Sequence, residues 1–121
     1  MILVDTSVWI DHLHRSEPML VEALEREEVL THPFVIGELA CGTIVRRAEV
    51  LESLAALPSA IVAADEEVLE LIERRRLWGK GLGYADAHLL ASALLTGGTQ
   101  LWTRDRRLHA IATEIRLHVP E

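Results

Sequence analysis

The sequence has 121 residues, half of them hydrophobic but only 4% aromatic, and a formal net charge of −7 at pH 7. These values exclude a disordered or fibrous protein and indicate a single domain over residues 1–121, because two shorter domains would each bury too little apolar surface. The negative charge is unfavourable for nucleic-acid binding unless bound cations offset it.

Along the chain, apolar residues at helical spacing, with Pro, Gly or Asp at the ends, predict seven helices. They cover residues 8–13, 18–28, 33–41, 46–57, a segment capped by Asp65, 85–96 and 104–113. Short apolar runs between them predict strands at residues 2–4, 29–31, 59–63, 100–103 and 115–119. This alternation predicts an α/β fold, a parallel sheet with helices on both faces.

Neither a membrane protein nor a disulfide-linked one is expected. No apolar run is long enough to span a bilayer, and the chain begins without a basic, cleavable leader pattern, so we expect a cytoplasmic protein. Cys41 is the only cysteine, which excludes an internal disulfide and a cysteine-based zinc site. We expect Cys41 to be a small buried residue.

Three acidic residues stand at strand or helix ends. Asp5 follows the first predicted strand, Asp105 follows the strand at 100–103, and Asp86 opens the helix before that strand. Ligands bind at the carboxyl ends of parallel strands, so adjacent placement of the two strands would bring Asp5 and Asp105 to one edge. Each acid, taken singly, is also explained as a helix-terminal residue that accepts free backbone N–H groups.

Glu38 lies in an apolar stretch of its predicted helix, where a buried carboxylate needs either a metal or an arginine as its partner. Four acids without a matching His and Cys set favour Mg²⁺ or Mn²⁺ over zinc. Such ions activate water and neutralise charge in phosphodiester cleavage. Around them, Thr6, Ser7 and Thr103 are candidates for hydrogen bonds to the carboxylates, or for helix caps.

Arg104, Arg106 and Arg107 flank Asp105 near a predicted helix start, and we expect them to receive the phosphates of a nucleic-acid substrate. The exposed run Arg74–Arg76 is instead expected to be a solvated helix face.

At these acids the sequence resembles the PIN-domain ribonucleases, specifically the VapC-type toxins of type II toxin–antitoxin systems. The resemblance covers the whole chain and rests on four motifs in order: Asp5-Thr-Ser-Val-Trp-Ile-Asp, Phe34-Val-Ile-Gly-Glu38-Leu, Tyr84-Ala-Asp86-Ala-His-Leu-Leu-Ala-Ser-Ala and Leu101-Trp-Thr-Arg-Asp105. It implies a Rossmann-like sheet, Mg²⁺ or Mn²⁺ at Asp5, Glu38, Asp86 and Asp105, endonucleolytic cleavage of single-stranded RNA, a homodimer, and inhibition by a cognate antitoxin.

Two other functions fit parts of the sequence. A phosphatase of the haloacid-dehalogenase kind also begins with a strand and an Asp, but it needs a second Asp where this chain has Ser7. A catalytically silent PIN-like module that binds RNA or protein is the alternative outside the enzymes. His88 departs from the commonly aliphatic residue of the family, and is expected to be structural or to lie beside the substrate.

Overall fold

Three short parallel strands form the centre of the computed structural model, which describes residues 1–119. They are β1 (Ile2–Val4), β2 (Val29–Leu30) and β3 (Gln100–Trp102), and their order in the sheet is β2-β1-β3. The register pairs Leu3 of β1 with Leu30 of β2 and with Leu101 of β3. The first strand of the chain is therefore the central one, next to a strand almost one hundred residues away.

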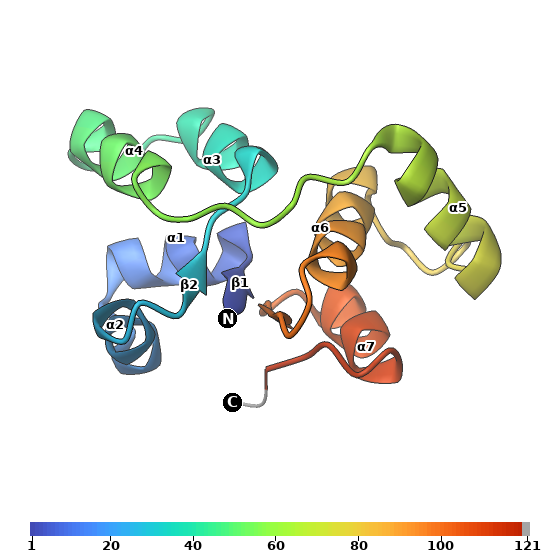
Figure 1. The fold of residues 1–121 in the computed structure, drawn as a ribbon. Coiled ribbons are helices and arrows are strands. Elements are labelled where there is room, and N and C mark those ends of the chain that lie inside the picture. The colour runs from blue at the N-terminus through green and yellow to red at the C-terminus, as the bar shows by residue number, and fades with distance from the viewer. Residues whose placement is uncertain (120–121) are drawn as a thin grey trace.

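Seven helices surround this sheet within residues 1–119. They are α1 (Thr6–His14), α2 (Pro18–Glu25), α3 (Pro33–Ala40), α4 (Arg47–Ala55), α5 (Asp65–Arg75), α6 (Tyr84–Leu95) and α7 (Arg106–Glu114). Figure 1 shows α1 to α4 on one side of the strands and α5 to α7 on the other. The predicted α/β fold is confirmed. None of these helices has the length and apolar content needed to cross a bilayer.

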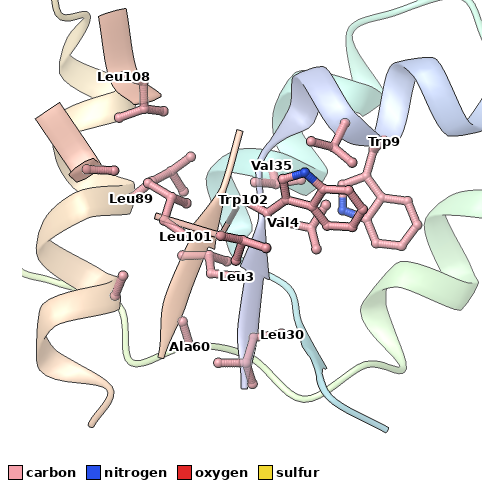
Figure 2. Packing of buried hydrophobic residues seen from close by; sticks show 14 of the residues in the cluster. Leu3, Val4, Trp9, Leu30, Val35, Ala60, Leu89, Leu101, Trp102 and Leu108 are labelled. Carbon is pink, nitrogen blue, oxygen red and sulfur yellow. The ribbon is translucent and has the colours of Figure 1, made fainter. Parts of the chain in front are cut away.

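The core lies where the strands contact both helical layers. Alternate strand residues point to opposite faces, and each of Leu3, Val4, Leu101 and Trp102 is at most 1% exposed. Figure 2 shows Leu89 and Leu108, from α6 and α7, against one side of the strands, and Trp9 and Val35, from α1 and α3, on the other. Burial on both faces explains why the strands read as continuous apolar runs.

Two of the predicted strands are wrong. Segment 59–63 makes one bridge, Thr31 to Ser59, and segment 115–119 makes one bridge, Leu101 to His118. In the first segment, Ile61 and Val62 are exposed, and the Ala63 amide donates to the Ser92 hydroxyl instead of to a strand. These apolar residues have the composition of strands, but they contact the sheet at single positions.

Some predicted boundaries also shift. Asp65 is the first residue of α5 and does not cap it, because Ala64 holds the cap position and Glu67 accepts its N–H. The helix predicted at 18–28 ends at Glu25, and Glu27 has a left-handed backbone with φ of 57°. Cys41 is exposed, so the expectation that it is buried is wrong.

His32 connects three elements from the interior of the fold. Its side chain is fully buried, and Nδ1 accepts the Phe34 N–H at 3.0 Å, which caps α3. Since Nδ1 is an acceptor, the neutral ring carries its proton on Nε2 and donates to Ser92 Oγ at 2.9 Å. Burial lowers the pKa of His32 to about 4.

We expect His32 to make the metal-free protein sensitive to acid. The folded state holds this imidazole neutral between its ordinary pKa of 6.5 and about 4, so stability falls as the pH drops through that window. The loss should reach about 2–3 kcal/mol. His32→Asn keeps an oxygen acceptor for the Phe34 N–H and removes the titration, so its urea stability should change less between pH 6.5 and 4. An equal change in both proteins would contradict this assignment.

Candidate active site

Asp5 stands at the carboxyl end of the central strand and caps α1. Although it is charged, it is only 5% exposed, and its backbone N–H donates to Trp102 O at 2.9 Å. Its Oδ2 accepts the hydroxyls of Ser7 at 2.7 Å and Thr103 at 2.8 Å. Within residues 1–119 no donor reaches the other oxygen, Oδ1. One carboxylate oxygen is thus held by the protein and the other is available.

Asp105 caps α7 at the end of the neighbouring strand. Its Oδ1 accepts the Leu108 N–H at 2.9 Å, and its own N–H donates to Thr103 Oγ1 at 3.0 Å. Thr103 therefore links the two acidic positions, since its hydroxyl also donates to Asp5. The expectation that parallel strands bring Asp5 and Asp105 to one edge agrees with this contact. Both interpretations of the sequence hold, because each acid is also a helix cap.

Glu38, on α3, is oriented toward the same edge by Thr6. The Thr6 hydroxyl donates to Glu38 Oε1 at 2.8 Å. The glutamate itself is exposed, so the expectation of an apolar, buried environment is wrong. Its apolar neighbours in sequence, such as Val35 and Leu39, are buried in the core, whereas the Glu38 side chain lies at the margin of that buried face. No arginine pairs with Glu38 in the described part of the chain.

Asp86 is within electrostatic reach of the other three acids. It lies in the first turn of α6, where the Gly83 N–H donates to its Oδ2 at 3.3 Å. The pKa of Asp86 is raised to about 6, first by burial and then by the negative charges of Asp5, Asp105 and Glu38, against the lowering effect of the Gly83 N–H. Acids from three other segments therefore act electrostatically on Asp86.

The donor set fits a hydrated divalent cation. Among residues 1–119, no three His, Cys, Asp or Glu side chains converge closely enough to form a complete ligand set. Mg²⁺ does not need one, because it keeps several waters and is usually bound through one or two carboxylates. The available oxygen of Asp5 and the mutual repulsion at Asp86 are the features that a cation would satisfy.

The three arginines predicted to contact substrate differ in their surroundings. Arg104 donates to Asp11 Oδ2 at 2.9 Å and to Glu17, and this hydrogen bond holds the pKa of Glu17 below its usual value. It thus joins the segment after β3 to α1 and to the start of α2. A substrate phosphate would have to compete with two carboxylates for Arg104.

Arg106 and Arg107 are exposed and have no such partners among the described residues. With Lys80 they line a surface hollow of about 580 Å³ beside α7. The sequence alone does not single out Lys80 as a substrate residue. Glu114 also lines the hollow and pairs with Lys80 at 3.6 Å, so Arg106 and Arg107 are its cations without an acidic partner among the described residues. This grouping of residues from separate segments is visible only in the fold.

His88 is packed inside the protein, 3% exposed. Its ring lies between Phe34 and Tyr84, with centroid distances of 4.3 and 4.8 Å, and its Nε2 bonds Asp65 Oδ1 at 2.9 Å. Asp65 also accepts the Tyr84 hydroxyl at 2.7 Å. These contacts are those of a structural residue that joins α3, α5 and α6.

A parallel sheet with acids gathered at its carboxyl edge is the arrangement expected of a PIN domain, and comparison with known proteins establishes the family. The chain belongs to the PIN-domain family, which matches residues 2–114. It is 55% identical over 114 residues to ribonuclease VapC32 of Mycobacterium tuberculosis, in strain CDC 1551 / Oshkosh and in strain ATCC 25618 / H37Rv, and the match covers 94% of this chain and 92% of each relative. The resemblance to VapC-type PIN domains is confirmed, and it replaces the phosphatase alternative.

Asp86→Asn should stabilise the metal-free protein. The folded pKa of Asp86 lies above its ordinary value of 3.8, so ionisation costs stability progressively as the pH rises from about 4 to about 6. Asn removes that cost and still offers an oxygen to the Gly83 N–H. Thermal unfolding in EDTA at pH 7 should show a gain of roughly 1–2 kcal/mol.

Glu52→Gln, at an exposed position of α4, is the matched control and should leave stability unchanged. A clear drop in melting temperature for Asp86→Asn would show that this carboxylate serves mainly as a structural cap of α6.

Proposed function

We propose that this protein is a divalent-metal-dependent endoribonuclease, a VapC-type toxin that cleaves single-stranded RNA in the cytoplasm. The proposal rests on the parallel pairing of β1 and β3, after which Asp5 and Asp105 follow at one edge joined by Thr103, and on the negative charges of Asp5, Glu38 and Asp105 acting on Asp86. The relatives named as ribonucleases support it. A catalytically silent module would have no use for this repulsion, which lowers the stability of the fold.

In this proposal the four carboxylates hold Mg²⁺ or Mn²⁺. The bound cation supplies an activated water and neutralises charge that develops on the phosphodiester. Ser7 and Thr103 keep Asp5 oriented by bonding its Oδ2, and Thr6 does the same for Glu38. Oriented ligands of this kind tune both the affinity and the position of a metal.

The distribution of charge suits an RNA strand despite the net charge of −7. The acids lie at the carboxyl edge of the sheet, where bound cations would reverse the sign of the local charge. The hollow of Lys80, Arg106 and Arg107 lies beside α7, the helix that Asp105 caps. A strand whose cleaved phosphate faces the acids would have neighbouring phosphates within reach of this basic hollow.

The family also implies a cognate antitoxin and a homodimer. A groove of about 510 Å³ between α1 and α4 offers an apolar surface for such a protein partner. Leu13 and Val45 line it and are 36% and 86% exposed, and Trp9 Nε1, also in its lining, is buried without a hydrogen-bond partner in the described residues. An amphipathic segment laid in this groove would cover these side chains.

The first test is cleavage of RNA with and without metal. The purified chain should cleave an unstructured RNA in Mg²⁺ or Mn²⁺, lose activity in EDTA and regain it on metal addition. Asp5→Asn and Asp86→Asn should each lower the cleavage rate by at least about 100-fold, because each removes a carboxylate from the site.

Glu52→Gln is the control: it removes an exposed charge on α4, outside the carboxylate site, and this variant should cleave at the wild-type rate. Cleavage that persists in EDTA, or that survives both aspartate substitutions, would contradict the proposed function. Absence of cleavage by well-folded wild type would favour the silent module.

Charge reversal at Arg106 and Arg107 should weaken RNA binding, most strongly at low salt, because binding of phosphates by cationic side chains releases counterions. The slope of log affinity against log salt should fall by about one for each phosphate that is no longer neutralised. Reversal of Arg74 and Arg75, which are exposed on α5, is the matched control and should have no such effect. If the salt dependence of RNA affinity were unchanged when Arg106 and Arg107 are reversed in charge, these arginines would not contact RNA phosphates.

A further inference from the structure

The segment between α5 and α6 carries an aromatic pocket that the proposed chemistry does not use. Trp78 follows α5 and is 57% exposed, whereas Trp9 and Trp102 are 5% and 1% exposed. Tyr84, at the start of α6, is 45% exposed. Both line a cavity of about 190 Å³ whose remaining walls are the small or apolar residues Ile72, Leu77, Gly79, Leu82, Gly83 and Ala87.

The Tyr84 wall of the pocket is held in place. The Tyr84 hydroxyl donates to Asp65 at 2.7 Å, and its ring lies edge-on against buried His88. On the other wall, Gly79 adopts a φ of 74° and nothing would lie within 4 Å of a Cβ built on it, so the turn after Trp78 leaves open space. A held tyrosine ring and an exposed indole beside open space are suited to receive a flat ring.

The pocket also adjoins the carboxylate site. Gly83 lines the pocket, and its N–H donates to Asp86 Oδ2. The same glycine-rich loop contacts the basic side, because the Arg107 side chain lies so close to Gly81 that an added Cβ would clash with it at 2.7 Å. One loop therefore separates an aromatic pocket from the basic hollow, with Asp86 at its end.

The charges indicate which part of a nucleotide belongs here. Asp65 and Glu66 act on Tyr84, and they raise the pKa of its hydroxyl, so this side of the loop repels phosphate. A neutral base is not repelled, and it gains stacking on the indole. Aromatic stacking beside a basic groove is the usual arrangement for binding single-stranded nucleic acid.

We propose that this pocket binds one nucleobase of single-stranded RNA, stacked on Trp78, while the adjoining backbone passes Asp86 toward Arg106 and Arg107. The inference rests on the proposed function and deepens it, since it names the residues that would select an unpaired strand. A base paired in a duplex could not enter, because its ring faces are already stacked.

The test uses Trp78 as its own reporter. In an Asp5→Asn background with Mg²⁺, where cleavage is not expected, a single-stranded RNA oligonucleotide should quench tryptophan emission, since the other two indoles are buried. An abasic oligonucleotide of equal length and charge should quench much less. Trp78→Ala should weaken RNA binding by about 5- to 100-fold, the range for removal of one stacked base, and leave abasic binding unchanged.

Trp78→Phe, which keeps a ring, should retain most of the affinity, and Leu69→Ala, at a comparably exposed position of α5, should retain all of it. Unchanged RNA affinity in Trp78→Ala would overturn the proposal, as would an equal decrease for the abasic probe. It would also be overturned if Trp78→Ala weakened only the association with the antitoxin.

The two proposals fail separately. If wild type cleaves no RNA yet shows base-dependent quenching, the nuclease proposal fails and the pocket stands. If wild type cleaves in Mg²⁺ and Trp78→Ala binds and cleaves equally well, the pocket proposal fails and the nuclease stands.

Discussion

The parallel pairing of β1 with β3 is the constraint from which the rest of the site follows. Because Leu3 and Val4 lie opposite Leu101 and Trp102, both segments leave the sheet at the same edge. The residues that come next are acids and hydroxyls, and they cap the helices that start there. A slip of one residue between these strands would exchange the side chains that pack on the two buried faces of the sheet and would shift Asp5 relative to Asp105.

At the same edge of the sheet, the negative charges of the acids lower the stability of the fold. The charges of Asp5, Glu38 and Asp105 act unfavourably on Asp86. Neutral donors hold the acids in place, among them the hydroxyls of Thr6, Ser7 and Thr103 and the N–H groups of Gly83 and Leu108. These donors satisfy individual oxygens and leave the total charge unchanged. Buried apolar contacts under both faces of the sheet therefore have to offset the repulsion, as is common where a site lowers stability in favour of function.

The sequence was informative where one local signal decided the outcome. Strand-end acids, helix caps and the four motifs predicted the fold class and the positions of Asp5 and Asp105. The strand predicted at segment 59–63 was wrong because apolar composition alone does not show whether a segment is buried. The apolar side chains of Ile61 and Val62 face solvent. The bonds that engage Arg104 could not be predicted, because they depend on side chains from elements separated in the sequence. The pocket of Trp78 and Tyr84 could not be predicted either, because it depends on the path of the glycine-rich loop between α5 and α6.

Asp5 has a further consequence for the choice of ion. Since two hydroxyls occupy Oδ2, this carboxylate can present a single oxygen to a cation. Calcium commonly takes both oxygens of an acidic side chain and tolerates irregular, crowded coordination, whereas magnesium prefers single oxygens at octahedral corners. In the proposed metal site, the two hydroxyl side chains would therefore leave Asp5 a single-oxygen ligand of the kind that octahedral Mg²⁺ accepts, without either hydroxyl contacting the ion.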